Sequence, residues 1–209
     1  MRPGLRAFFL WTLPLLLLFP AASATADETT ANLQSKVIVS FDDEASRQWI
    51  VQGSKFTTKD FPQTSIVRTW PDSLFGRNPE KKDLFALGIH SRFDRKGYNS
   101  IEIIPAKKGS DGKLVPTTLP LPGRMKSIDL WVWGSNYNYT MDVHLRDFEG
   151  IDRVLHLGSL QFAGWRNMST TITGNIPQSR RYIPRFMALE LTKLVIWTTP
   201  DERVDYFYV

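Results

Sequence analysis

The chain has 209 residues, of which 42% are hydrophobic and 22% charged, and its formal net charge is +5. This composition is ordinary for a globular protein and excludes a disordered or fibrous chain. The absence of cysteine excludes disulfides, thiolate metal sites, a cysteine nucleophile and a bacterial lipoprotein anchor.

The N-terminal segment has the pattern of a cleaved signal peptide. Arg2 and Arg6 precede an apolar run of 13 residues, which is too short to cross a bilayer as a helix. Small residues follow, and Ala24-x-Ala26 fits a signal-peptidase site, with Ala22-x-Ala24 as a second candidate. We therefore expect cleavage after Ala26 and export to the periplasm.

The exported chain is predicted to be a flexible arm, residues 27–35, followed by a single domain over residues 36–209. A chain of this length is enough for one well-buried core and hardly enough for two. No second apolar run of about 18 residues occurs, so we expect no membrane span. Residues 1–26 contain two arginines and no acidic residue, so their removal lowers the net charge by two and argues against a nucleic-acid partner.

After residue 35, the hydrophobic pattern has mostly a period of two, and short β-rich runs are separated by glycine, proline, asparagine and aspartate. We therefore predict an all-β fold, a jelly-roll-like antiparallel β-sandwich with long irregular loops. Residues 186–194 are the best helix candidate, but they run directly into Val195, Ile196 and Trp197, which favour a strand. The predicted strands cover residues 37–41, 65–70, 85–90, 98–104, 127–133, 137–146, 152–157, 166–173, 191–198 and 204–209.

Two long connections interrupt these strands. Residues 71–83 and 105–124 are rich in proline and glycine, which favour turns. The second connection could link two domains, but the residues before it would make a marginal domain on their own. We therefore predict that it is a loop crossing between strands.

Residues 137–157 give the best-defined local prediction, a β-hairpin. The loop Phe148-Glu149-Gly150 places glycine where a left-handed backbone is needed. Asp147 then faces Ile151, and a slip of one residue would mix the apolar and polar faces. This register predicts the pairs Val143 with Leu155, Met141 with Leu157, Arg146 with Asp152, and Asp142 with His156.

Several motifs along the chain resemble those of a known protein family. The longest is LPLPGRMKSIDLWVWGSNYNY at residues 119–139. The others are LFG (74–76), LGI (87–89), FDRKGYN (93–99), HLRDFEG (144–150), GWRN (164–167), IP (176–177), YIPR (182–185) and LVIWT (194–198). Together they are similar to the FlaA-type flagellar filament outer layer (sheath) proteins of spirochaetes. The sequence departs from the family at its end, because it stops at Val209 where members commonly continue.

The resemblance implies a non-enzymatic structural subunit of the layer that surrounds the flagellin core of periplasmic flagella and contributes to motility. Its implied partners are flagellin core subunits and other sheath proteins in a higher-order filament assembly. It implies no cofactor, no metal and no catalytic residue. The alternative is a secreted carbohydrate-binding β-sandwich module, because the GWRN step and the hairpin also look like those of carbohydrate-binding jelly rolls.

Trp131 and Trp133 are candidate interaction residues. In the predicted strand 127–133 they alternate with Ile128, Leu130 and Val132, so the two tryptophans share the opposite face. They could stack on a sugar ring or form the centre of a protein contact. They could equally belong to the core, where large apolar side chains usually lie. Tyr137 and Tyr139 are assigned to the core.

Arg180, Arg181 and Arg185 are the second candidate group. They lie within a short basic stretch that also contains Tyr182. A solvated loop is the plainest interpretation, and a salt-sensitive contact with an acidic neighbouring subunit is the functional one.

Metal binding is a weaker hypothesis at two places. Asp142, His144 and His156 share one face of the predicted hairpin, but an exposed Asp–His pair of modest energy explains them better than a metal site. The acidic run at residues 42–44 could bind calcium together with Asp205 if the ends of the domain meet, and an aspartate-capped turn explains it equally well.

Overall fold

The protein is described here from a computed structural model, which describes residues 33–80, 83–179 and 187–209. The predicted signal peptide and Arg180, Arg181 and Arg185 lie outside the described residues. Clustering of contacts separates residues 1–36 from one compact unit, Val37–Val209.

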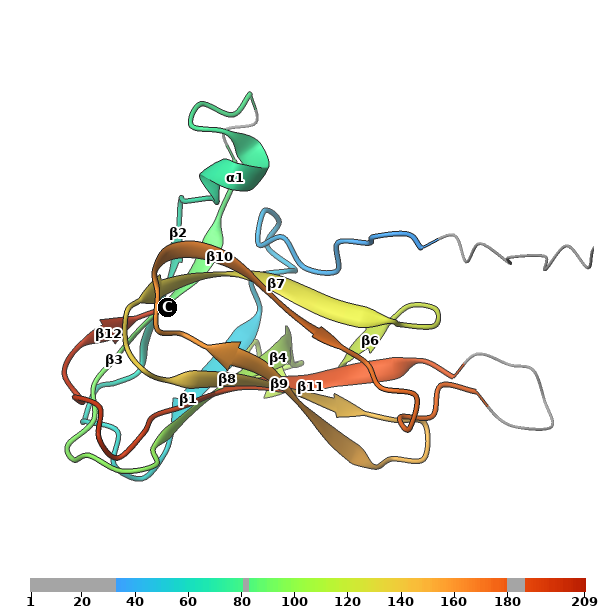
Figure 1. Ribbon diagram of the computed structural model, residues 1–209. Coiled ribbons are helices and arrows are strands. Elements are labelled where there is room, and N and C mark those ends of the chain that lie inside the picture. The colour runs from blue at the N-terminus through green and yellow to red at the C-terminus, as the bar shows by residue number, and fades with distance from the viewer. Residues whose placement is uncertain (1–32, 81–82, 180–186) are drawn as a thin grey trace, which may run out of the picture. The chain divides into compact units, whose positions relative to one another are not determined.

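The compact unit is almost entirely built from strands (Figure 1). A single turn of helix, α1 (Asp72–Phe75), interrupts the series of strands in the described residues. The strands are β1 (Trp49–Gly53), β2 (Gln63–Val67), β3 (Ala86–Ser91), β4 (Ser100–Lys108), β5 (Leu114–Pro116), β6 (Leu119–Leu121), β7 (Ser127–Ser135), β8 (Thr140–Arg146), β9 (Asp152–Ser159), β10 (Ala163–Thr171), β11 (Leu189–Trp197) and β12 (Phe207–Tyr208).

The described strands form three antiparallel sheets. The largest has the order β1-β4-β11-β8-β9, with β5 added to β4 and β6 added to β11. The β7–β10 ribbon lies over this sheet, and the β12-β3-β2 sheet lies beside the ribbon (Figure 1). All strand pairs are antiparallel, so the predicted all-β antiparallel sandwich is confirmed.

One continuous apolar core lies between the layers. Across the large sheet, Val51, Ile103, Leu194, Val143 and Leu155 are consecutive neighbours in one row. The ribbon and the small sheet close the core from the other side with Val132, Met168, Ile89 and Phe207. Burial of these side chains stabilises the fold because each gives about 1.5–3 kcal/mol when removed from water.

A β-bulge in β11 explains why residues 186–194 were the best helix candidate. The register shifts between Leu191 and Lys193, which leaves Thr192 as the extra residue, and Thr192 Oγ1 donates to the carbonyl of His144 at 3.0 Å. The bulge changes the phase of the alternation, so Leu189 and Leu191 before it and Ile196 after it are buried in the core, and the partly buried Leu194 packs against it. The break in the period of two near Thr192 therefore marks a bulge within a strand and does not indicate a helix.

The predicted β8–β9 hairpin is confirmed at its closed end. The Asp147 and Ile151 backbones are bonded, and Gly150 has a φ of +81°. The pairs Val143–Leu155, Arg146–Asp152 and Asp142–His156 are all present. The predicted pair Met141–Leu157 is wrong, because a second register shift places Gly158, with a φ of +132°, opposite Met141.

Two other strand predictions need correction. Residues 37–41 do not form a strand, because Phe41 takes a φ of +61° and the Arg47 side chain bonds the carbonyl of Phe41 in a turn. Residues 105–124 are not a plain crossing loop, since they complete β4 and contain β5 and β6. Both short strands have one strand neighbour, where proline is tolerated.

Candidate interaction surface

The β7–β10 ribbon carries three tryptophans on the face that points away from the core. Trp133 pairs directly with Trp165, and Trp131 pairs with Asn167. The alternate residues Val132 and Met168 are buried, so the core fixes the direction of the tryptophans. Trp133 is 40% exposed, and Trp131 and Trp165 are half-buried. Trp131, Trp133 and Trp165 are called the tryptophan face below.

A polar pair and a tight backbone contact hold this ribbon in place. Asn167 Nδ2 donates to Asp129 Oδ2 at 2.8 Å, next to Trp131. A Cβ atom on Gly134 would lie 2.6 Å from the carbonyl oxygen of Phe162, so only glycine permits this approach beside Trp133. The tryptophan face is therefore a rigid platform built on regular strands, which suits a protein contact or stacking on a flat ligand.

A second group of aromatic residues lies on the β12-β3-β2 sheet. The ring of His90 stacks on the ring of Tyr208, with 4.2 Å between the ring centroids. It also contacts the rings of Tyr206 and Phe61, with 5.2 Å between centroids in each pair. Arg92 lies over the Tyr206 ring and donates to its hydroxyl at 3.1 Å. Both tyrosines are exposed. These five residues are called the C-terminal aromatic cluster.

Hydrogen bonds connect this cluster to the ribbon. Ser135, at the end of β7, donates to the carbonyl of Tyr208 and accepts from its backbone N–H. Tyr137 and Tyr139 are buried, as predicted, and their hydroxyls donate to the carbonyls of Tyr206 and Arg203. Burial raises the pKa of Tyr139, so this donor stays protonated. These hydrogen bonds thus tie the C-terminal aromatic cluster to the end of β7 and to Tyr137.

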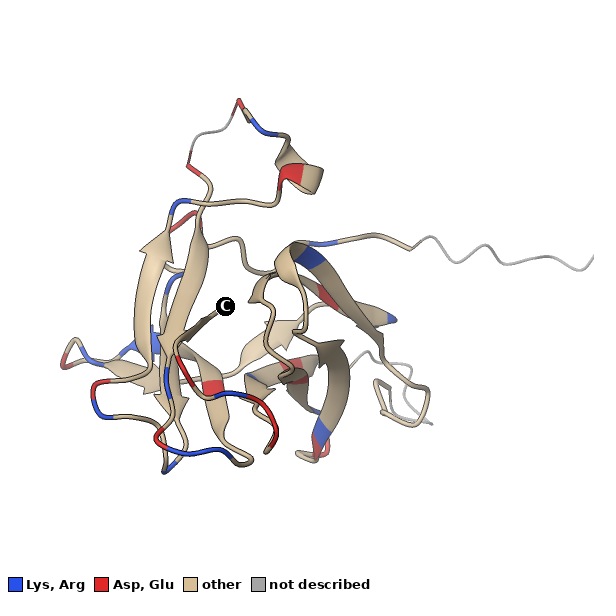
Figure 2. Ribbon diagram, turned by 60° about the vertical axis from the view of Figure 1, so that its left-hand side comes forward, with Lys and Arg blue, Asp and Glu red and all other residues tan. Residues whose placement is uncertain are grey.

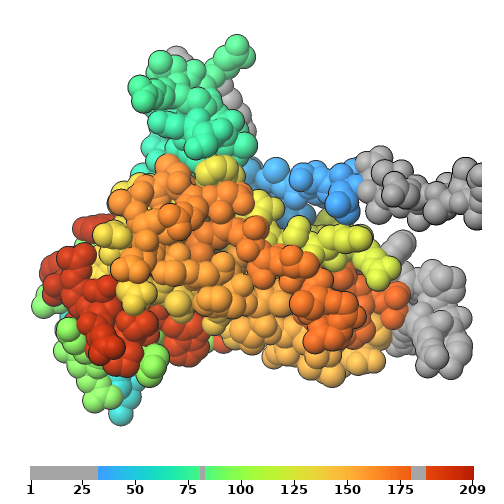
Figure 3. Space-filling view, in the orientation of Figure 1, coloured from blue at the N-terminus to red at the C-terminus, as the bar shows by residue number. Residues whose placement is uncertain are grey.

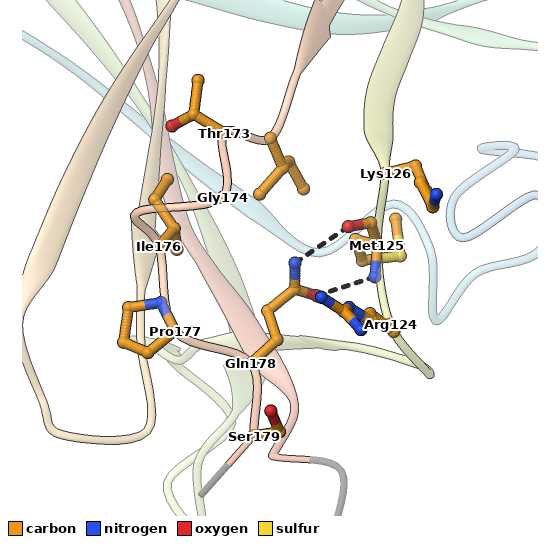
Figure 4. A pocket seen from close by; sticks show the side chains of 10 residues that line it. Arg124, Met125, Lys126, Thr173, Gly174, Ile176, Pro177, Gln178 and Ser179 are labelled. Carbon is orange, nitrogen blue, oxygen red and sulfur yellow. Dashed lines mark hydrogen bonds between the residues drawn. The ribbon is translucent and has the colours of Figure 1, made fainter. Parts of the chain in front are cut away.

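A cleft of about 430 Å³ lies at the end of the ribbon, beside the point where the chain leaves the described residues at Ser179. Gln178 closes it with two bonds to the Met125 backbone, at 2.7 and 2.8 Å (Figure 4). Arg124 and Lys126 line it and are exposed, and none of the described residues that line it is acidic. The described lining of the cleft is therefore basic, and the neutral side chain of Gln178 lies across it.

Several polar side chains lie on the outer face of the large sheet. Glu102 accepts bonds from Lys193 and Gln52, and these lower its pKa although partial burial alone would raise it. Asp142 and His156 form the predicted pair at 2.8 Å. His144 does not join them, because its Nε2 is buried without a hydrogen-bond partner, and burial, helped by Lys193, lowers its pKa.

The acidic turn has structural partners. The Asp43 carboxylate accepts the backbone N–H of Ser46 at 2.8 Å, and Glu44 pairs with Lys108 at 2.9 Å.

In the described parts of the chain, no group of three histidine, aspartate or glutamate side chains is placed to hold a metal ion. Among the same residues, no helix is long and apolar enough to cross a membrane.

Charged residues lie largely in the connections, and the strands carry few of them (Figure 2). In Figure 3, the orange part of the chain, from about residue 150 to about residue 175, forms a continuous surface without a deep hollow. The sequence analysis named Trp131 and Trp133 as candidates but did not name Trp165 or the C-terminal aromatic cluster. The GWRN motif contains Trp165, but the sequence alone does not show that the strand with this motif pairs with β7.

The fold defines the protein as a β-sandwich with aromatic side chains exposed on the β7–β10 ribbon and beside the β12-β3-β2 sheet. The chain belongs to the flagellar filament outer layer protein family FlaA, whose family model matches residues 20–209. It is therefore a flagellar filament outer layer protein, and the resemblance of its motifs is confirmed.

Two individual proteins are similar to this chain. A protein of Brachyspira hyodysenteriae described as flagellar filament outer layer-like is 26% identical over 166 residues, and the match covers 75% of this chain and 71% of that protein. The solved structure of the module TmCBM61 in complex with β-1,4-galactotriose is 14% identical, with a TM-score of 0.37, and the match covers 78% of this chain and 88% of that one.

Proposed function

We propose that the protein is exported to the periplasm and forms part of the layer around the flagellin core of periplasmic flagella, where it contributes to motility. Its role is structural and non-catalytic. The family match over residues 20–209 carries this proposal. Flagellin and the other outer layer proteins are its partners.

The tryptophan face supports a role in assembly. A coat subunit must repeat the same contact many times, and linked weak contacts raise avidity without new chemistry. Tryptophan is enriched at the centres of protein contacts because it buries a large area with little loss of side-chain entropy. A partly exposed Trp133 beside Trp131 and Trp165 supplies such an anchor on the outside of the ribbon.

The experiment is fractionation of periplasmic filaments from the native host. Filaments are purified from the wild-type host, and the corresponding periplasmic material is purified from a strain that lacks the flagellin genes. The chain is then detected in both samples by mass spectrometry. We expect the protein on intact filaments, with an N-terminus at Asp27, or at Thr25 if the second cleavage site is used. Absence from filaments together with micromolar binding to a defined glycan would favour a carbohydrate-binding module instead.

A further inference from the structure

One edge of β2 has no strand partner in the described part of the fold. β2 is the last strand in the order β12-β3-β2, and all five of its residues are exposed. Its sequence, QTSIV, contains no charge and no proline, and its pairing with β3 has no register shift. An exposed, regular strand edge of this kind is a template for pairing with another strand.

Two other edge strands in the described residues carry the features that prevent such pairing. β5 has three residues and ends in Pro116. β9 carries Asp152, Arg153 and His156 along its length. On β2, in contrast, Val67 is 42% exposed and Ile66 is also exposed, so apolar side chains face solvent on both sides of the strand. The edge is therefore suited to an added apolar strand.

The same chain contains a strand-like segment without a strand partner. Residues 37–39 are Val-Ile-Val, the β-branched composition of a strand, yet their backbones form no hydrogen bond in the described structure. Val37 is 79% exposed. Ile38 packs on the core, and Arg47 fixes the carbonyls of Phe41 and Asp42, so the segment is anchored at one end.

We propose that residues 37–40 of one copy of this chain add as an edge strand to β2 of a second copy. Main-chain hydrogen bonds supply the affinity, and Val37 supplies apolar contact beside Ile66 or Val67. Each copy then offers one donor segment and one acceptor edge, so the contact is head-to-tail, and we infer an open series in which each copy contacts two different neighbours. This inference rests on the proposed function, in which copies of the subunit repeat along a filament.

The test compares matched lysine variants of the full exported chain by sedimentation velocity. Val67→Lys blocks the acceptor edge, Thr64→Lys blocks it at a second position, and Val37→Lys blocks the donor segment. Val154→Lys is the control, because Val154 is a 56% exposed valine on β9. Circular dichroism of each variant establishes that its fold is unchanged.

We expect the wild-type protein and Val154→Lys to form an open series of oligomers that grows with concentration. Val67→Lys, Thr64→Lys and Val37→Lys should each be monomeric. An equimolar mixture of Val67→Lys and Val37→Lys should stop at a dimer, because one variant keeps only the donor and the other keeps only the acceptor.

Three results would overturn the proposal. The first is a wild-type protein that stays monomeric up to about 1 mM, the effective concentration that short linkage supplies in an assembly. The second is oligomerisation of Val37→Lys equal to the wild type, which would indicate β2–β2 pairing. The third is a mixture that remains monomeric. If oligomerisation behaves as expected but the chain is absent from filaments, the strand exchange stands and the proposed function fails.

Discussion

Asp147 and Arg153 form an ion pair across the β8–β9 hairpin, with 2.8 Å between Arg153 Nη2 and Asp147 Oδ2, and the Asp147 side chain is fully buried. The other carboxylate oxygen accepts the backbone N–H groups of Glu149 and Ile151. One side chain therefore closes the loop and neutralises an arginine. Burial alone would raise the pKa of Asp147, but these bonds and Arg153 lower it.

We expect Asp147→Ala to destabilise the domain by about 2–4 kcal/mol, because it leaves two part-buried N–H groups and Arg153 without their acceptor. Asp147→Asn should cost less, since it keeps an acceptor for the two backbone donors. Urea unfolding at neutral pH measures both. Equal losses for the two variants would show that only the charge matters.

The pH dependence of Asp147 has a definite sign. Its folded-state pKa lies below the ordinary value of 3.8, so its stabilising effect is complete above about pH 4 and is lost as the pH falls through the lower folded value. Unfolding followed between neutral pH and pH 3 should therefore show a smaller acid-induced loss in Asp147→Asn than in the wild type. An identical slope in both proteins would contradict this assignment.

His144 should make the domain less stable in mild acid. Burial lowers its folded-state pKa from 6.5, so the unfolded chain binds the proton more readily, and stability falls as the pH drops below about 6.5. In His144→Gln this part of the pH dependence should disappear, whereas in His156→Gln, which removes the exposed partner of Asp142, it should remain. Thermal unfolding at pH 5.5 and 7.5 gives the comparison.

Gly150→Val should destabilise the hairpin by about 1–2 kcal/mol, because a left-handed backbone places a side chain too close to the following carbonyl. A Cβ atom on Gly150 would meet no neighbour within 4 Å, so the cost is conformational and not steric contact with the rest of the fold. Gly174→Val is the matched control, since Gly174 is equally open and lacks a left-handed φ. Equal losses would contradict the explanation.

Trp133→Ala should reduce retention of the protein on purified filaments by about tenfold, the effect of losing a contact hot spot. Its effect on the free energy of unfolding should be modest, because Trp133 is partly exposed. Trp197→Ala is the control, since Trp197 has a similar exposed fraction, 37%, and lies on β11 of the large sheet. Retention that falls equally in both variants would exclude a specific role for the tryptophan face.

Local alternation and turn chemistry alone were enough to predict several features of this protein. The period of two placed Trp131 and Trp133 opposite Val132, and Gly150 set the register that joins Val143 to Leu155. These features depend on residues close together in the chain, and a strand has only two faces. The ordered motifs were likewise sufficient to identify the family.

Only the tertiary structure decided which distant segments meet. Trp165 joins Trp133 because β10 pairs with β7, and Ser135 connects β7 to Tyr208 some 70 residues later in the chain. The bulge at Thr192 could not be predicted from the sequence either. It shifts the in–out alternation of β11, and such a shift is favourable only when the apolar side chains on both sides of the bulge pack against the core. Pairing between strands depends on packing across the whole core, and a single sequence does not record which surfaces that packing brings together.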